Sequence, residues 1–156
     1  MRLVKLLIIF ISCLGLIGQA QASCKQQAQV ALAFMNGYVA YSQAIMGSKT
    51  TMNTASWLGK FPHLAADFIP AYKKLEAQGR EQDAELGWGM DLIFDAQDYP
   101  DQGFQLLRCK ANDLVELRGR DWPEFTVVVK TVKQQGRYLV AGAGRVNLSA
   151  SERAQR

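Results

Sequence analysis

The clearest helical pattern in the chain lies between residues 26 and 46. Apolar side chains recur there at steps of three or four residues, which places them on one face of a helix. Gly47 and Ser48 come next and are typical of a helix end. The aromatic face of the helix predicted over 26–46 suits either ligand stacking or packing onto a sheet, and packing is the simpler interpretation. The face consists of Val30, Phe34, Tyr38, Tyr41 and Ile45.

A second helical pattern covers 54–78 and contains a proline. Pro70 has no backbone donor and its ring clashes with the preceding turn, so we expect it to interrupt the helix. The sequence therefore predicts a short helix over 54–67 and another that begins near Pro70 and ends at Gly79. Their inward-facing residues would be Trp57, Leu58, Phe61, Leu64, Phe68, Ala71, Tyr72 and Leu75.

Beyond residue 103 apolar residues alternate with polar ones, which is typical of strands with one buried face. Turn residues separate the alternating stretches, and Gly142 and Gly144 in the last one indicate a bulge or a close backbone approach. We expect strands over 104–110, 113–118, 124–133 and 138–146.

The alternation also predicts which side chains face the helices. Leu107 and Cys109 would do so in the first strand, and Val115 and Leu117 in the second. Glu116 alternates with them, so we expect the opposite face to be exposed to water. Helices followed by four strands indicate an α+β fold, with N-terminal helices packed on one face of a curved four-stranded antiparallel sheet.

The N-terminus has the three parts of a secretory signal peptide. Arg2 and Lys5 make it positive, residues 6–17 are almost entirely apolar, and residues 20–22 read Ala-Gln-Ala, an A-x-A cleavage site. The apolar run is short for a transmembrane helix. A lipoprotein modified at Cys13 is the alternative, but residues 10–12 make a poor lipobox.

We therefore expect a signal peptide over 1–22 that is cleaved off, which leaves a secreted, periplasmic protein. A single domain would cover 23–148, and residues 149–156 would form a polar, frayed tail. Cleavage removes Arg2 and Lys5 from the 18 basic side chains and none of the 14 acidic ones, so the formal net charge falls from +4 to about +2. Without a concentrated basic face we expect no nucleic-acid partner, and no membrane contact after cleavage.

Two cysteines remain after cleavage, Cys24 and Cys109. In an oxidising compartment such a pair most simply forms a disulfide. The bond would join the start of the first helix to the first strand, which agrees with the face predicted for Cys109. A catalytic thiol or a metal site needs further partners, but His63 is the only histidine and there is no CxxC. We expect no metal, no cofactor and no enzymatic activity.

Residues 91–102, "DLIFDAQDYPDQ", are rich in aspartate. Their spacing does not match a calcium-binding EF-hand loop, and a paired-carboxylate hydrolase would need a desolvated carboxyl that this polar run does not suggest. One remaining interpretation is a turn-rich crossover from helices to sheet, in which Asp91, Asp95 and Gln97 hydrogen-bond to the backbone. The other is a partner-binding surface formed by Trp88, Asp98, Tyr99 and Asp101.

Charge is divided unevenly along the chain. Between residues 76 and 101 eight acidic side chains accompany one basic side chain, Arg80, whereas ten basic and five acidic ones follow from residue 108 onward. An acidic region steers a cationic partner toward itself, and aromatic residues such as Trp88 and Tyr99 are common anchors of interfaces. The pattern suits a surface that binds a basic protein, but a solvated loop explains the same residues, and both interpretations stay open.

Three stretches resemble the domain of unknown function 3828 family, whose members are secreted or envelope proteins of Gram-negative bacteria. The stretches are "FIPAYKKLEA", "FDAQDYPD" and "VVVKTVKQQGRYLVAGAGRVNL". Asp91, Ala96, Gln97 and Asp98 match the D-P-x-x-x-A-Q-D motif of that family, whereas Leu92 stands where proline is common. The resemblance implies helices packed on a curved antiparallel sheet, with no established activity.

More loosely, the chain is similar to small periplasmic immunity proteins that neutralise peptidoglycan amidases delivered by type VI secretion. The first hypothesis is a non-catalytic periplasmic protein-binding module, and in its narrower form an immunity protein whose acidic loop inhibits a basic peptidoglycan hydrolase. The alternative is a small-ligand-binding protein with a pocket between helices and sheet, lined by Tyr38, Tyr41 and Phe125.

Overall fold

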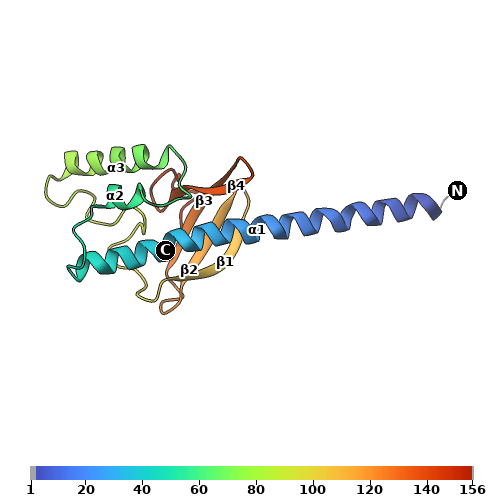
Figure 1. The fold of residues 1–156 in the computed structure, drawn as a ribbon, viewed down its shortest axis with the longest axis horizontal. Coiled ribbons are helices and arrows are strands. Elements are labelled where there is room, and N and C mark those ends of the chain that lie inside the picture. Colours follow the sequence, from blue (N-terminus) through green and yellow to red (C-terminus); the bar gives the residue numbers. More distant parts are fainter. Residues whose placement is uncertain (1–2, 156) are drawn as a thin grey trace.

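The chain folds as helices followed by one antiparallel sheet (Figure 1). This computed structural model describes residues 3–155, with side chains from residue 21 onward. Within these residues the helices are α1 (Leu3–Met46), α2 (Thr54–Leu58) and α3 (Phe68–Gln82). The strands are β1 (Phe104–Lys110), β2 (Leu114–Gly119), β3 (Thr126–Gln134) and β4 (Arg137–Ala143). The predicted α+β fold is confirmed.

The sheet is a meander in which each strand pairs antiparallel with the next, in the order β1-β2-β3-β4. α1 lies across one face of the sheet and contacts all four strands, while its first half extends away from the other elements (Figure 1). That half contains most of the segment expected to be a signal peptide, and its cleavage stays a prediction. None of the helices within residues 3–155 is long and apolar enough to cross a membrane.

Aromatic side chains of α1 and α2 form much of the core. Phe34 and Tyr38 are buried, and the ring of Trp57 lies 5.7 and 5.2 Å from theirs, measured between centroids. Phe68 of α3 adds an edge-on contact with Phe34 at 5.5 Å. The face predicted for the first helix is therefore the packed one, except that Ile45 is 41% exposed because the last turns of α1 run past the sheet (Figure 1).

Pro70 does not interrupt a helix. α3 begins at Phe68, so Pro70 lies in its first turn. The backbone N–H groups of a first turn have no acceptor within the helix, and a missing donor costs nothing there. The helix was expected to begin near Pro70, and it begins two residues earlier, with the proline inside its first turn.

The helix predicted over 54–67 is also wrong, since α2 ends at Leu58. The chain that follows covers the outer edge of the sheet instead. Ala65 donates a backbone hydrogen bond to the Val140 carbonyl at 2.9 Å, and Val140 donates to the His63 carbonyl at 2.8 Å. Pairing with an edge strand competes with the helix here, and it closes an edge that would otherwise expose unpaired backbone groups.

β1 contains a bulge that the alternation of residues does not reveal. Its register with β2 shifts between Leu106 and Arg108. Phe104 is buried and Cys109 is bonded to α1, although residues five apart point to opposite faces of a regular strand. Leu107 is 39% exposed as a result, and the inward orientation expected for it is wrong.

The C-terminal segment covers part of the opposite sheet face. Leu148 is buried there beside Leu114, and Glu152 forms an ion pair with Lys130 at 2.9 Å. Glu116, which we expected to be exposed, is only 7% exposed. Leu148, Glu152 and Ala154 therefore contact the sheet, whereas residues 149–151 are exposed.

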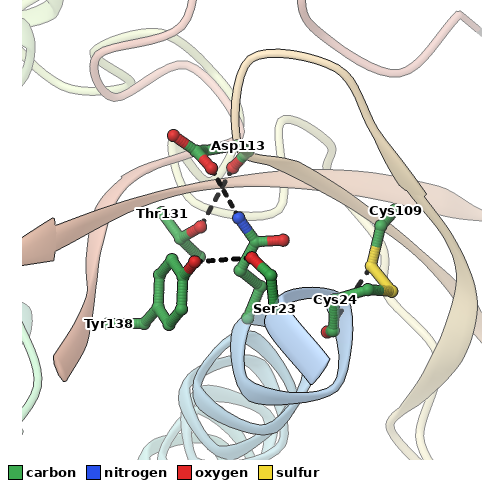
Figure 2. Close-up of a disulfide and its surroundings, with 7 residues drawn as sticks. Ser23, Cys24, Cys109, Asp113, Thr131 and Tyr138 are labelled. Carbon is green, nitrogen blue, oxygen red and sulfur yellow. Dashed lines mark hydrogen bonds between the residues drawn. A yellow bond between two sulfur atoms is a disulfide. The ribbon is translucent and has the colours of Figure 1, made fainter. Parts of the chain in front are cut away.

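The predicted disulfide between Cys24 and Cys109 is confirmed (Figure 2). It joins α1 to β1 across 85 residues of sequence and is compatible with an oxidising compartment. Two side-chain hydrogen bonds hold the same part of α1, and they join Ser23 to Tyr138 at 2.5 Å and Gln27 to Asp113 at 2.6 Å (Figure 2). α1 is thus attached to both β1 and β4 near the point where the mature chain would begin.

We expect the chain that begins at Ser23 to show no free thiol when it is denatured without reductant, because both of its cysteines form the disulfide. The double replacement Cys24→Ser with Cys109→Ser should lower the free energy of unfolding by about 4 kcal/mol, since a long loop is no longer closed in the unfolded state. Thiol titration and urea denaturation measure the two effects. Two titratable thiols per chain would contradict the bond.

Candidate functional site

Asp91 anchors the crossover segment, residues 83–103, which links α3 to β1. Its Oδ1 atom accepts hydrogen bonds from the backbone N–H groups of Ile93 and Phe94, both at 2.8 Å. Its Oδ2 atom accepts one from the hydroxyl of Tyr38 in α1 at 2.5 Å. The Asp91 N–H donates to the Ala96 carbonyl at 2.9 Å and closes the turn. One carboxylate therefore shapes the turn and attaches it to the long helix.

The charge of Asp91 has no cationic partner among the described contacts, because the groups that donate to it are neutral. Burial raises the pKa of Asp91 above its ordinary value of 3.8, while the hydrogen bonds from Tyr38 and the backbone oppose that rise. Burial and the neighbouring carboxylate also raise the pKa of Tyr38, which keeps the hydroxyl protonated as a donor.

The end of β4 holds the other side of the same turn. Arg145 pairs with Asp95 at 3.1 Å through Nε, and its backbone N–H donates to the Leu92 carbonyl at 2.8 Å. Gly144 has a φ of +56°, and a Cβ there would lie 2.3 Å from the carbonyl oxygen of Ile93. Only glycine fits, so the close backbone approach expected at this position is confirmed.

Asp98, Tyr99 and Asp101, three of the residues expected to bind a partner, have different surroundings. Asp98 and Asp101 are exposed, whereas Tyr99 is half-buried. The ring of Tyr99 is stacked on Phe94 with 4.3 Å between centroids. The two carboxylates are therefore accessible to a partner, while the tyrosine ring mainly supports the segment.

Trp88, the fourth residue expected to bind a partner, is fixed by contacts within the protein. Its indole N–H donates to the Leu75 carbonyl at 2.6 Å, and the Arg145 guanidinium lies 4.9 Å from the ring centroid. Nearby, Gln97 donates to the Gly89 carbonyl at 3.0 Å. Trp88 lines a cavity of about 180 Å³ against α3, apart from the surface that carries Asp98.

A groove of about 490 Å³ lies beside Asp98, between the crossover segment and the β2–β3 connection. Trp122 is 43% exposed at this place, whereas Phe125 is 3% exposed, and their ring centroids are 5.1 Å apart. We call this hollow the crossover groove. It is lined by Ala96, Gln97, Asp98, Trp122, Glu124 and Phe125.

Two contacts hold the walls of the crossover groove together. The carboxylate of Asp121 accepts hydrogen bonds from the backbone N–H groups of Asp101 and Gln102, both at 3.1 Å. At Gly119 a Cβ would lie 2.5 Å from the Pro100 side chain, so the walls approach this closely only because the position has no side chain. The groove is therefore built into the fold and does not depend on a ligand to form.

Asp121, Trp122 and Glu124 escape prediction from the sequence. They lie in the part of the chain where basic residues outnumber acidic ones, so a count of charges along the chain does not single out Asp121 and Glu124. In the fold, the β2–β3 connection that carries these residues lies beside Asp98. The available signal is the stretch "RDWPEF", in which an aromatic residue and a proline lie between two acids.

The pocket lining expected of Tyr38 and Tyr41 is not what the structure shows, since they are only 2% and 7% exposed and belong to the core. A cavity of about 340 Å³ lies instead between α1 and the β3–β4 hairpin, with His63, Arg137 and Tyr138 in its lining. In the part of the chain that the structure describes, no group of three or more acidic, histidine or cysteine side chains is arranged to hold a metal ion.

The chain matches no described protein family, no curated protein and no solved structure. The resemblance to the domain of unknown function 3828 family and to immunity proteins therefore stays a prediction.

The raised pKa of Asp91 has a consequence for stability. Between the ordinary value and the raised one, the folded protein holds more protons than the unfolded chain, so the free energy of unfolding should fall as the pH rises through this window. Asp91→Asn keeps an acceptor for Ile93 and Phe94 but cannot titrate. Urea denaturation from about pH 3 to pH 7 should show a contribution in the wild type that this variant lacks. Asp98→Asn, at an exposed position, is the control and should follow the wild type.

Proposed function

We propose that the mature protein is a non-catalytic, periplasmic binding module that recognises a basic protein through the crossover groove and the carboxylates around it. These carboxylates, which we call the acidic rim, belong to Asp98, Asp101, Asp121 and Glu124. Asp98 and Glu124 line the groove, and Asp121 joins its wall to Asp101 through the backbone.

The observation that carries the proposal is an exposed tryptophan beside carboxylates in a preformed groove. Tryptophan is enriched at the energetic centres of protein interfaces, where a pocket excludes water around it. Carboxylates around such a centre speed association with a cationic partner and disfavour acidic ones. Because the walls are already joined, binding requires little ordering of the crossover segment.

A basic peptidoglycan hydrolase is the partner class that we favour. The predicted signal peptide and the disulfide support a periplasmic location, where such an enzyme acts on the cell wall. A short, anchored, acidic segment suits the entrance of a basic active-site cleft. In this form of the proposal the protein is an immunity protein that inhibits the enzyme by occupying its cleft.

The cavity between α1 and the β3–β4 hairpin favours a second candidate function, the binding of a small envelope metabolite. Val30, Ala33 and Tyr138 give it an apolar surface, and Arg137 adds a cationic group. A thermal-shift screen of envelope metabolites distinguishes the two candidates, because a ligand that binds here raises the melting temperature without any protein partner.

Reversal of charge at the acidic rim should weaken binding of a basic partner. We expect Asp98→Lys with Asp101→Lys to raise the Kd at least about tenfold and to flatten its dependence on salt, because attractive charge pairs become repulsive. The partner is first captured from periplasmic and secreted fractions with the mature protein at low salt. Titration calorimetry at several salt concentrations then measures the Kd.

The matched control is Glu81→Lys with Glu85→Lys. These two residues are exposed and belong to the same acidic stretch, and their replacement changes the net charge equally, but they do not line the crossover groove. This variant should keep most of the affinity. An equal loss in both double variants would mean that only net charge matters, and an unchanged affinity in both would remove the rim from the interface.

A further inference from the structure

The crossover groove combines groups that suit one cationic side chain. Asp98 comes from one wall and Glu124 from the other, and the indole of Trp122 lies with them. Among the described residues no ion pair involves either carboxylate, and no cationic group lies over the Trp122 ring. The groove therefore has a partly exposed aromatic surface and two carboxylates that no described ion pair neutralises.

The same chain contains a filled version of this arrangement. The guanidinium of Arg145 lies 4.9 Å from the centroid of the Trp88 ring, and its Nε pairs with the Asp95 carboxylate at 3.1 Å. The combination of tryptophan, carboxylate and guanidinium is thus a contact that this fold already makes. In the crossover groove the tryptophan and the carboxylates are present and the guanidinium is missing.

We propose that the crossover groove is a receptor site for one arginine side chain of the basic partner. This inference rests on the proposed function and names the residue that the groove recognises. The guanidinium stacks on the Trp122 indole and donates hydrogen bonds to the carboxylates of Asp98 and Glu124. The aliphatic stem of the arginine passes along the apolar lining near Phe125 and Ala96.

Arginine fits these groups better than lysine for three physical reasons. Its planar guanidinium stacks on an aromatic face and donates to a carboxylate through two parallel hydrogen bonds, whereas an ammonium group is a point charge. A guanidinium is also less strongly hydrated, so it enters a partly apolar groove with a smaller desolvation cost. Apart from this preference, the cation–π attraction of either side chain is strongest over tryptophan and increases as water is excluded.

A set of short peptides tests the proposal without any change to the protein. The peptides are neutral and rich in glycine and serine, are blocked at both ends, and carry arginine, lysine, citrulline or norleucine at one position. Each is titrated into the mature, ¹⁵N-labelled protein, and the Kd is taken from chemical-shift changes. We expect the arginine peptide to bind at least about fivefold more tightly than the lysine peptide and at least about tenfold more tightly than the citrulline peptide.

Protein variants assign the site. Trp122→Ala should weaken binding of the arginine peptide at least about fivefold, and Asp98→Asn with Glu124→Gln at least about tenfold. Trp122→Phe keeps an aromatic face and should lose less than Trp122→Ala. The control is Glu81→Gln with Glu85→Gln, which removes the same charge at a distance from the groove and should bind like the wild type. Thermal denaturation of each variant confirms that it is folded.

Three results would overturn the arginine site. They are equal affinity for the arginine and lysine peptides, an affinity that Trp122→Ala does not change, and no binding of any peptide. The proposed function fails separately. If the captured partner still loses affinity with Asp98→Lys and Asp101→Lys while the peptide series shows no preference for arginine, the acidic rim binds the partner and the groove holds no arginine. If the partner is indifferent to the rim variants, the function itself is wrong.

Discussion

The carboxylate of Asp91 connects the crossover segment to α1, and the position of the crossover groove depends on that connection. It accepts hydrogen bonds from the Tyr38 hydroxyl and from the N–H groups of Ile93 and Phe94. A half-buried charge is costly when its hydrogen bonds are missing, so the geometry that supplies these bonds is favoured. Arg145 pairs with Asp95 on the other side of the turn. The segment is therefore held between the long helix and the end of the sheet.

A chain of contacts leads from this turn to the surface. The Phe94 ring, positioned by Asp91, stacks on Tyr99, and Asp101 and Gln102 then donate their N–H groups to Asp121. Through these contacts the core determines where the acidic rim lies. The disulfide acts near the middle of α1, where the half of the helix that packs on the sheet begins. The helix is thus held at two places, by the disulfide at Cys24 and by the hydrogen bond from Tyr38 to Asp91.

Much of the fold follows from the sequence, because periodicity reports local burial. The steps of three and four in α1 identify its buried face. The alternation in β2 locates the strand but not its burial, because both faces of β2 are covered. The pairing of Cys24 with Cys109 also follows, since two cysteines in an oxidising compartment leave a single choice. Local patterns do not report a bulge, and for this reason the orientation of Leu107 could not be predicted.

The candidate site is harder to predict, because it depends on residues that only the fold brings together. Asp98 is visible in an acidic stretch, but Trp122 and Glu124 follow two strands later and join it through the return of the meander. The aromatic residues chosen from the sequence, Trp88 and Tyr99, lie in the right segment but support it from within. Tertiary packing determines which tryptophan is exposed, and neither a count of charges nor the spacing of residues predicts it.

In the proposed function, the partner binds at a preformed acidic groove. The most direct test is an NMR map of the mature, ¹⁵N-labelled protein against the captured partner, with the indole N–H of Trp122 and the backbone N–H groups of Gln97 and Asp98 as reporters. These signals should shift or broaden most, while those of the β3–β4 hairpin should stay unchanged. The largest changes at the hairpin, with Trp122 unaffected, would contradict the proposed function.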